Sequence, residues 1–368
     1  MRKRFLFCLA CMAALSFSGC WDKAELESRG FVISLGIDKA ANVRGFDVFM
    51  TLPNVAAIAG KDGTEGNNRT ILHAQADALS AAMHAADASV GQSLYYGHTK
   101  IAIFGANCLM DATLFKQSIN SLDRNSELSQ KLIILATEGA AAEILAAKSP
   151  GEPLIGTFVA NFYKNNEDSV NATVKTDLEQ LLLALNTTGH AILPRIAIED
   201  GEVKLSGAAV LKDAALAGWL DEVQTRGYLW LHGEGKGAIL TVPHEGLRVP
   251  FRILQCKRTL TFEEVEGRLI CRVKLDAKGS VEEMTVSPDM LIDDDTLNTL
   301  ARQFESEIER ELQETFALFQ NEYRMDAPNL LGSLYKQNPS LYRKYAQDRD
   351  EAFCNMQLET DIHISIVR

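Results

Sequence analysis

The clearest pattern of hydrophobic and polar positions lies in the last third of the chain. Hydrophobic side chains recur there every three or four residues, at Leu297, Leu300, Phe304, Ile308, Leu312, Phe316 and Phe319. That spacing places them on one face of an α-helix, so we predict one long helix over about residues 294–322. Asp293-Asp294-Asp295 precedes it, where carboxylates cap free N–H groups and meet the positive end of the helix dipole. A calcium or acid–base cluster is the weaker interpretation, because the run lacks EF-hand spacing.

Alternating hydrophobic and polar positions flank this helix. They predict strands over residues 237–242, 248–262, 268–278, 280–286 and 358–367. We therefore predict a C-terminal domain, residues 236–368, in which an antiparallel sheet packs with the long helix.

The first half of the chain alternates strand and helix patterns instead. Strands are predicted over 30–38, 45–52, 99–104, 131–136, 191–198 and 203–211; helices are predicted over 75–90, 114–122, 138–147, from a capping box at 176–179 to 185, and over 213–226. This alternation predicts layered packing. We expect an α+β, multi-domain protein of three domains with mixed and antiparallel sheets: an N-terminal α+β region of one or two subdomains (20–195), a connecting strand–helix segment (196–235) and the C-terminal domain.

The start of the chain has the layout of an export signal. Arg2, Lys3 and Arg4 form a basic region, residues 5–17 are apolar, and the small residues Ser18 and Gly19 stand directly before Cys20. The apolar run is short for a spanning helix. We predict a lipoprotein signal peptide over residues 1–19 and lipidation of Cys20; a plain signal peptide with an incidental cysteine is the alternative.

The net negative charge of the chain makes some classes of binding partner unsuitable. The three basic residues contribute +3 to a formal net charge of −12, so the remainder of the chain carries −15. Nucleic acid is an unsuitable partner for such a chain, because phosphates require a basic surface. Anionic lipid would also repel it, so membrane attachment requires a hydrophobic anchor, and two or three acyl chains would suffice.

Four cysteines, Cys108, Cys256, Cys271 and Cys354, follow Cys20, and no two of them form a C-x-x-C pair. Cys256 and Cys271 fall on two predicted neighbouring strands, where each alternates with apolar residues. They are interpreted as small core residues, although a disulfide between them is an open alternative in an exported protein.

Candidate chemistry is sparse. The chain has no G-x-S-x-G, H-E-x-x-H or P-loop motif, and we predict no catalytic residue, metal site or cofactor. Trp219 and Trp230 either pack an interdomain core or contact a partner. His98 and Lys100, on a predicted strand, belong either to a sheet edge or to a partner contact.

Four groups of segments form a recognisable series along the chain. They are Cys20-Trp21-Asp22-Lys23-Ala24-Glu25-Leu26 with Gly36-Ile37-Asp38, Gly97-His98-Thr99-Lys100-Ile101 with residues 123–127, Ser206-Gly207 through Lys212 with Ala217-Gly218-Trp219-Leu220, and the long helix followed by Asp326-Ala327-Pro328-Asn329-Leu330. Together these segments resemble the C-subunit family of bacterial spore germinant receptors, the GerC-type lipoproteins. Leu211 stands where many relatives carry Phe, and the last segment matches more loosely. The resemblance spans nearly the whole chain after Cys20.

The resemblance implies a three-domain α+β lipoprotein on the outer face of the spore inner membrane or the cell membrane. It would be a non-enzymatic subunit acting with two integral-membrane subunits, of the A and B types, in a complex that responds to nutrients. The alternative is a lipid-anchored solute-binding or sensor protein, which would need a cleft between two similar lobes.

Overall fold

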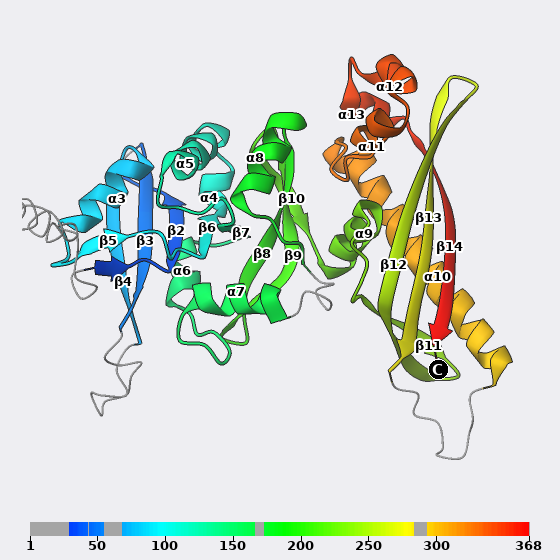
Figure 1. The fold of residues 1–368 in the computed structure, drawn as a ribbon, viewed down its shortest axis with the longest axis horizontal. Coiled ribbons are helices and arrows are strands. Elements are labelled where there is room, and N and C mark those ends of the chain that lie inside the picture. Colours follow the sequence, from blue (N-terminus) through cyan, green and yellow to red (C-terminus); the bar gives the residue numbers. More distant parts are fainter. Residues whose placement is uncertain (1–28, 43, 55–67, 166–172, 283–292, 368) are drawn as a thin grey trace, which may run out of the picture.

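The computed structural model describes residues 29–42, 44–54, 68–165, 173–282 and 293–367. Cys20 and the predicted signal peptide lie outside these residues. Two bodies lie side by side (Figure 1), which we name the N-terminal lobe (residues 29–220) and the C-terminal lobe (residues 222–367).

An eight-stranded sheet in the order β10-β9-β8-β7-β6-β2-β3-β4 forms the centre of the N-terminal lobe. Its strands are β2 (Ser34–Lys39), β3 (Phe46–Pro53), β4 (Arg69–Ala76), β6 (Ile101–Gly105), β7 (Ile133–Thr137), β8 (His190–Glu199), β9 (Glu202–Lys212) and β10 (Ala215–Leu220). The four middle strands, β2, β6, β7 and β8, run parallel, and antiparallel strands flank them. A separate ribbon pairs β1 (Arg29–Phe31) with β5 (Ser93–Tyr95) in parallel.

Helices cover both faces of the middle strands. In β6, Ile101 and Ile103 belong to one core, while Ala102 and Phe104 belong to the other. The first core is closed by α6 (Ala141–Ala146) and α7 (Ile155–Asn165), and the second by α3 (Leu79–Asp87), α4 (Ala106–Leu109), α5 (Ala112–Arg124) and α8 (Leu178–Thr187). Strands buried on both faces carry continuous apolar runs, and β6 and β7 do so.

The C-terminal lobe contains a four-stranded sheet in the order β11-β12-β13-β14. Its strands are β11 (Ile239–His244), β12 (Leu247–Val265), β13 (Arg268–Val281) and β14 (Gln357–Val367), and its helices are α9 (Glu222–His232), α10 (Asp294–Leu318), the π-helical turn η2 (Phe319–Tyr323), α11 (Leu330–Gln337), α12 (Pro339–Tyr345) and α13 (Arg349–Cys354). The predicted long helix is confirmed as α10 with η2. Its stripe is buried from Leu300 to Phe319, and the Asp293 carboxylate caps it by accepting a 2.8 Å hydrogen bond from the Thr296 N–H.

Two predictions for the C-terminal lobe were wrong in detail. The last strand, β14, pairs with β13 in parallel, so the sheet is mixed rather than antiparallel, with α10 to α13 forming the connection between them. The strand predicted over residues 268–278 continues through Gly279 to Val281 as β13, because Gly279 lets the backbone of Arg252 approach closely. The end of the strand predicted over residues 280–286 lies outside the described residues. The disulfide left open between Cys256 and Cys271 does not form, and both thiols are free. Cys256 pairs with Ala277, six residues along β13 from Cys271, so at ~3.4 Å per residue the cysteines lie ~20 Å apart.

The predicted helix over residues 213–226 was also wrong. Asp213 and Ala214 both take positive φ and form a two-residue turn, so Ala215–Leu220 folds back on β9 as strand β10. The helix begins only at Glu222, where Asp221 and Gln224 form a capping box. The helical spacing of Leu216, Trp219, Leu220 and Val223 was therefore misleading, because the first three lie in β10 and Val223 lies in α9.

Smaller corrections concern helix starts and missed elements. The helix predicted from residue 75 begins at Leu79, because Gln75 and Ala76 belong to strand β4, which pairs with β3. The capping box before α8 uses Asp177 and Gln180 rather than Thr176 and Glu179. The sequence did not predict helices α4, α7, α11, α12 and α13, strands β4 and β5, or the pairing of β5 with β1. The strand predicted over residues 30–38 is divided into β1 and β2.

The predicted division at residues 195 and 235 stays a prediction. Within the predicted connecting segment, β9 and β10 belong to the eight-stranded sheet and α9 packs on α10. We propose that the functional division of the chain falls near Asp221, between β10 and α9.

Candidate functional site

His98 and Lys100 lie at the surface of the N-terminal lobe. His98 occupies a turn and Lys100 precedes β6, so neither lies on the predicted strand. The His98 ring lies 5.1 Å from the ring of Phe31 and 5.8 Å from that of Tyr95. Both side chains are exposed, and their contact with a partner remains a prediction.

Trp219 and Trp230 occupy different environments. Trp219 is half-buried on β10 against the core of the N-terminal lobe. Trp230 is fully buried in α9, and its indole N–H donates a 2.9 Å hydrogen bond to Glu311 Oε2. The Trp230 ring therefore has the packing role, because it offers no surface to a partner in this conformation.

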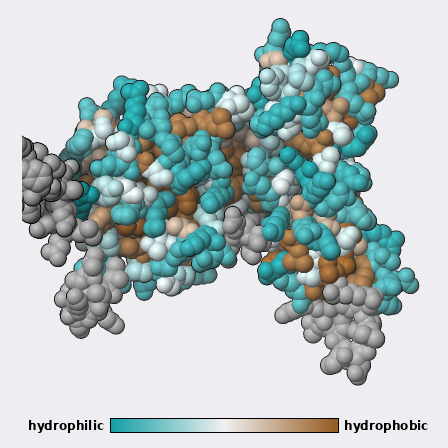
Figure 2. All heavy atoms as spheres, viewed as in Figure 1, coloured by the Kyte–Doolittle hydropathy of each residue, from teal (hydrophilic) through white to brown (hydrophobic). Residues whose placement is uncertain are grey.

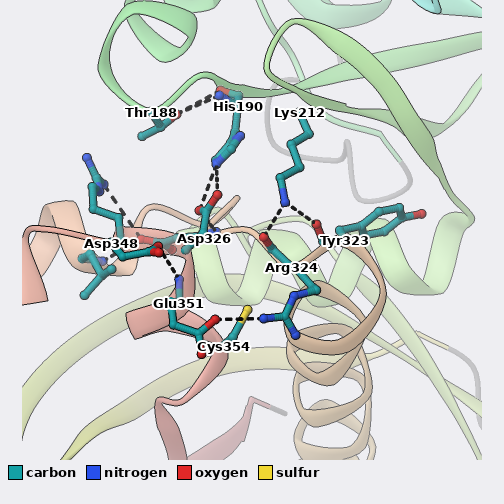
Figure 3. A network of polar contacts seen from close by, with 12 residues as sticks. Thr188, His190, Lys212, Tyr323, Arg324, Asp326, Asp348, Glu351 and Cys354 are labelled. Atoms are coloured by element: carbon teal, nitrogen blue, oxygen red, sulfur yellow. Dashed lines mark hydrogen bonds and ion pairs between the residues drawn. The ribbon is translucent and has the colours of Figure 1, made fainter.

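The structure brings together a polar network between the lobes that the sequence did not indicate (Figure 3). His190 and Lys212 lie opposite each other on β8 and β9, at the end of the sheet that faces the C-terminal lobe. His190 Nε2 lies 3.0 and 3.1 Å from the two carboxylate oxygens of Asp350 on α13. These residues are 160 positions apart, so no local pattern could have linked them.

Asp326 caps helix α11 with its carboxylate and contacts Asp350 through its backbone N–H. Its buried carboxylate accepts hydrogen bonds of 2.8 Å from the backbone N–H groups of Leu330 and Leu331, at the start of α11. Burial raises the pKa of the Asp326 carboxyl, although those two N–H groups oppose the shift. The Asp326 N–H in turn donates to Asp350 Oδ1 at 3.3 Å.

Lys212 forms the second connection across the lobes. Its ammonium donates to the backbone carbonyls of Tyr323, at 3.1 Å, and Arg324, at 2.7 Å. These carbonyls end the α10–η2 helix, where free acceptors and the negative end of the helix dipole favour a cation. The Tyr323 hydroxyl donates back to the Trp219 carbonyl at 3.0 Å, so the contact is reciprocal.

An open cleft of about 720 Å³ adjoins this network and is lined by both lobes. Leu183 of α8 and Tyr335 of α11, 66% and 57% exposed, stand among its lining residues. Figure 2 shows hydrophobic surface gathered over α8 and beside β10. Large apolar side chains exposed next to a cleft are typical of interaction surfaces.

Metal ligands and thiols are the remaining candidates for chemistry among the described residues. Within the part of the chain that the structure describes, no cluster of three or more His, Cys, Asp or Glu side chains could hold a metal ion. Burial raises the pKa of the Cys271 thiol to about 12 and of the Cys108 thiol to about 12, so neither is an activated nucleophile. The arrangement is suited to holding two lobes in a fixed orientation.

The segments that carry the family resemblance have structural roles. Asp38 accepts hydrogen bonds from the N–H groups of Ala141, at 2.8 Å, and Ala142, at 3.2 Å, and so caps α6. Glu127 Oε2 accepts the N–H of Tyr96 at 2.8 Å, which joins the second pair of segments. Gly207 has φ +78°, and a side chain there would collide with the Leu220 carbonyl. These positions fix helix starts and close backbone approaches.

Comparison with known families covers almost the whole described chain. Residues 22–198 match the spore germination protein N-terminal domain, and residues 206–368 match the family described as spore germination B3/GerAC like, C-terminal. The chain belongs to the GerAC-like spore germination family. Its two family regions meet at the β8–β9 hairpin, at the end of these strands opposite His190 and Lys212.

Individual GerAC-like relatives are similar over their full length. Spore germination protein YndF of Bacillus subtilis (strain 168) is 21% identical, over 97% of this chain and 95% of that protein. Spore germination protein B3 of the same strain is 20% identical over 96% and 94%, and germination protein KC is 21% identical over 96% and 92%. The relatives are thus spore germination proteins of the C type, as the resemblance implied.

The solved structure of the GerBC protein has the same fold. It superposes with a TM-score of 0.63 over 91% of this chain and 97% of that one, at 19% sequence identity. The predicted α+β class with several packed sheets is therefore confirmed for this GerAC-like chain. At 19% identity, the similarity to GerBC shows a common fold and nothing further.

Proposed function

We propose that this chain is a non-enzymatic subunit of a nutrient germinant receptor, anchored by lipid on Cys20 to the outer face of the spore inner membrane. It would act there with two integral-membrane subunits. The observation that carries the proposal is the full-length match to GerAC-like germination proteins, with family regions that begin two residues after Cys20.

The anchor is supported by the sequence around Cys20. A basic start, 13 apolar residues and two small residues precede the cysteine. Among the helices that the structure describes, none combines the length and apolar character needed to cross a bilayer. A chain whose remainder carries −15 would be repelled by anionic headgroups, so acyl chains would supply the attachment.

A non-enzymatic role agrees with the shape of the contact between the lobes. Its polar groups bind one another or backbone groups, as in His190 with Asp350 and Lys212 with the carbonyls of η2. A solute-binding protein of the two-lobed kind would need similar lobes, whereas one lobe has an eight-stranded sheet and the other a four-stranded one. The alternative therefore gains no support.

Anchoring would also explain how modest contacts suffice. A tether confines the body to a thin layer at the membrane, which raises its effective concentration near the membrane subunits. The exposed apolar residues of the cleft would then be sufficient for a contact that is weak in solution.

The proposal is tested with Cys20→Ala in spores and in cells that lack the two membrane subunits. We expect the variant to leave the membrane fraction and to reduce nutrient-triggered germination, while mass spectrometry of the parent protein finds a diacylated N-terminal Cys20. The matched control is Cys11→Ala, which alters the predicted signal and should change neither result. An unmodified N-terminus, or a Cys20→Ala protein that stays with membranes in the absence of its partners, would refute the anchor.

A further inference from the structure

The β1–β5 ribbon and the loop that leads from it to β6 carry a group of aromatic and basic side chains. We name Arg29, Phe31, Tyr95, His98 and Lys100 the ribbon patch. The Phe31 and Tyr95 rings meet edge to face at 6.0 Å, and His98 contacts both. The Arg29 guanidinium lies 5.1 Å from the centre of the Tyr95 ring. His98 and Lys100 are exposed, and the other three are half-buried.

The local backbone holds this patch at the surface. The Val32 N–H bonds to the Tyr95 carbonyl at 3.0 Å, and the Thr99 hydroxyl donates to the Val32 carbonyl at 3.1 Å. A side chain at Gly97 would collide with the Tyr95 ring, so that ring lies across the turn before His98. The aromatic group is therefore a fixed part of the fold.

The short stretch of chain between Cys20 and the ribbon patch limits how far the patch can lie from the membrane. Arg29 follows Cys20 by nine residues, and at ~3.3–3.6 Å per residue their Cα atoms lie at most ~30 Å apart. An anchored chain must therefore keep β1 close to the bilayer. Strand β5 lies at the end of the molecule opposite the C-terminal lobe (Figure 1), so that lobe can extend away from the membrane.

The chemistry of the patch fits phospholipid headgroups. Amphipathic aromatic rings are enriched where one end meets apolar matter and the other meets water, as at a membrane interface. Arg29 and Lys100 add two positive charges to a strongly acidic chain, and cations near a surface are attracted to anionic lipid. Glu127 lies close by, but its carboxylate accepts the backbone N–H of Tyr96.

We propose that the ribbon patch is the surface that this chain lays against the phospholipid headgroups of its membrane. The inference rests on the proposed anchor at Cys20. It adds an orientation: the N-terminal lobe lies on the bilayer by its β1–β5 end, and the cleft between the lobes is held above it, open to partner domains.

The test uses the chain from residue 20 onward, coupled chemically through Cys20 to a maleimide lipid in vesicles of phosphatidylcholine and phosphatidylglycerol. Cys256 and Cys354, which are half-buried, are replaced by Ser. An encoded azide at position 98, or at position 266 as the matched control, carries a fluorophore. Glu266 is exposed and lies in the turn between β12 and β13, in the C-terminal lobe. Nitroxide-labelled headgroups then quench each probe by proximity.

We expect the probe at position 98 to be quenched several-fold more than the probe at position 266. The Arg29→Gln/Lys100→Gln variant should lose part of this difference on vesicles containing phosphatidylglycerol, and little on phosphatidylcholine alone. Equal quenching of the two probes, or stronger quenching at position 266, would overturn the proposal. Protection of position 98 only in membranes that contain the receptor's other subunits would also overturn it, and would assign the patch to a protein contact.

The chemical lipid separates this inference from the anchor itself. A failed quenching experiment rejects the orientation while leaving lipidation in cells intact. An unmodified Cys20 in cells rejects the anchor whatever the vesicles show.

Discussion

The two lobes bury their sheets in different ways. In the N-terminal lobe, short helices close both faces, so neighbouring residues of one strand, such as Ile134 and Leu135, are both fully buried in separate cores. In the C-terminal lobe, α10 covers one face, and β13 alternates buried Val273 and Leu275 with exposed Arg272 and Lys274. A two-sided sheet needs helices on both faces, whereas a one-sided sheet buries one face, here with α10 as its longest covering helix.

The largest effect is expected at the buried ion pair between Glu311 of α10 and Arg226 of α9. Glu311 is fully buried, and its Oε2 accepts hydrogen bonds of 2.9 Å from both Arg226 Nε and Trp230 Nε1. Glu311→Ala leaves the Arg226 charge in the core without its partner, which costs about 3–5 kcal/mol of unfolding free energy. Chemical denaturation followed by Trp230 fluorescence measures the change.

The control for this prediction lies one turn further along the same helix. Glu314 pairs with Arg310 at the surface, at 60% exposure, so Glu314→Ala should cost no more than about 1 kcal/mol. Equal losses in the two variants would show that α10 is not the support that the comparison requires.

The next largest effect tests the two kinds of sheet directly. Ile134→Ala and Leu135→Ala should each cost about 2–5 kcal/mol, because each removes apolar volume from a closed core. In β13, Leu275→Ala should cost as much, but Lys274→Ala should change stability by only about 0.5 kcal/mol. Denaturant unfolding of the four variants compares them, and a neutral Leu135→Ala would contradict the two-sided arrangement.

A moderate effect is expected where the lobes meet. In a double-mutant cycle with His190→Ala and Asp350→Ala, we expect a coupling of about 0.5–3 kcal/mol. The exposed pair Arg310 and Glu314 should give only about 0.3–0.5 kcal/mol. A coupling at His190 and Asp350 no larger than in this control would mean that the two lobes are positioned by apolar contacts alone.

The smallest expected effect concerns pH. Burial raises the pKa of Asp38 in one lobe and of Asp326 in the other. Each carboxyl then holds its proton more tightly when folded, so its contribution is full below the unfolded pKa of about 3.9 and is lost as pH rises through the folded pKa. Asp38→Asn and Asp326→Asn should therefore gain stability relative to the parent as pH increases from about 4, measured by denaturation at several pH values.

The pKa of Asp293 is shifted in the opposite direction, so its effect on stability should have the opposite dependence on pH. The backbone N–H of Thr296 lowers the pKa of its carboxyl, so its contribution is present above the unfolded pKa and is lost as pH falls. Asp293→Asn should approach the parent's stability below pH ~4. A common pH trend in all three variants would contradict the assignment of these shifts.

The sequence predicted best where one period governs a long element. The stripe from Leu300 to Phe319 needed no partner to be recognised as a helix, and the acidic run before it marked the start. It failed at residues 213–226, where two residues of positive φ turned a helical spacing into a hairpin. Backbone turns that depend on positive φ at Asp and Ala leave little trace in the hydrophobic pattern.

The contact between the lobes was beyond sequence reasoning for another reason. Trp219, Trp230, His98 and Lys100 were selected by residue type, yet the groups that join the lobes include His190, Lys212 and Asp350. The sequence around each of these residues shows no motif that would link it to the others, and only tertiary packing brings them together. The resemblance located the right segments, such as Asp326, without revealing that they serve as helix caps.

Much of the contact between the lobes has main-chain atoms on one side. Lys212 binds the carbonyls of residues 323 and 324, and the Tyr323 hydroxyl binds the carbonyl of residue 219. Substitution at an acceptor position leaves its carbonyl in place, so these bonds survive changes in the side chains that bear them. A contact between lobes that depends on backbone carbonyls is insensitive to many substitutions at those positions. The two lobes can therefore keep one mutual orientation while the side chains on their surfaces change.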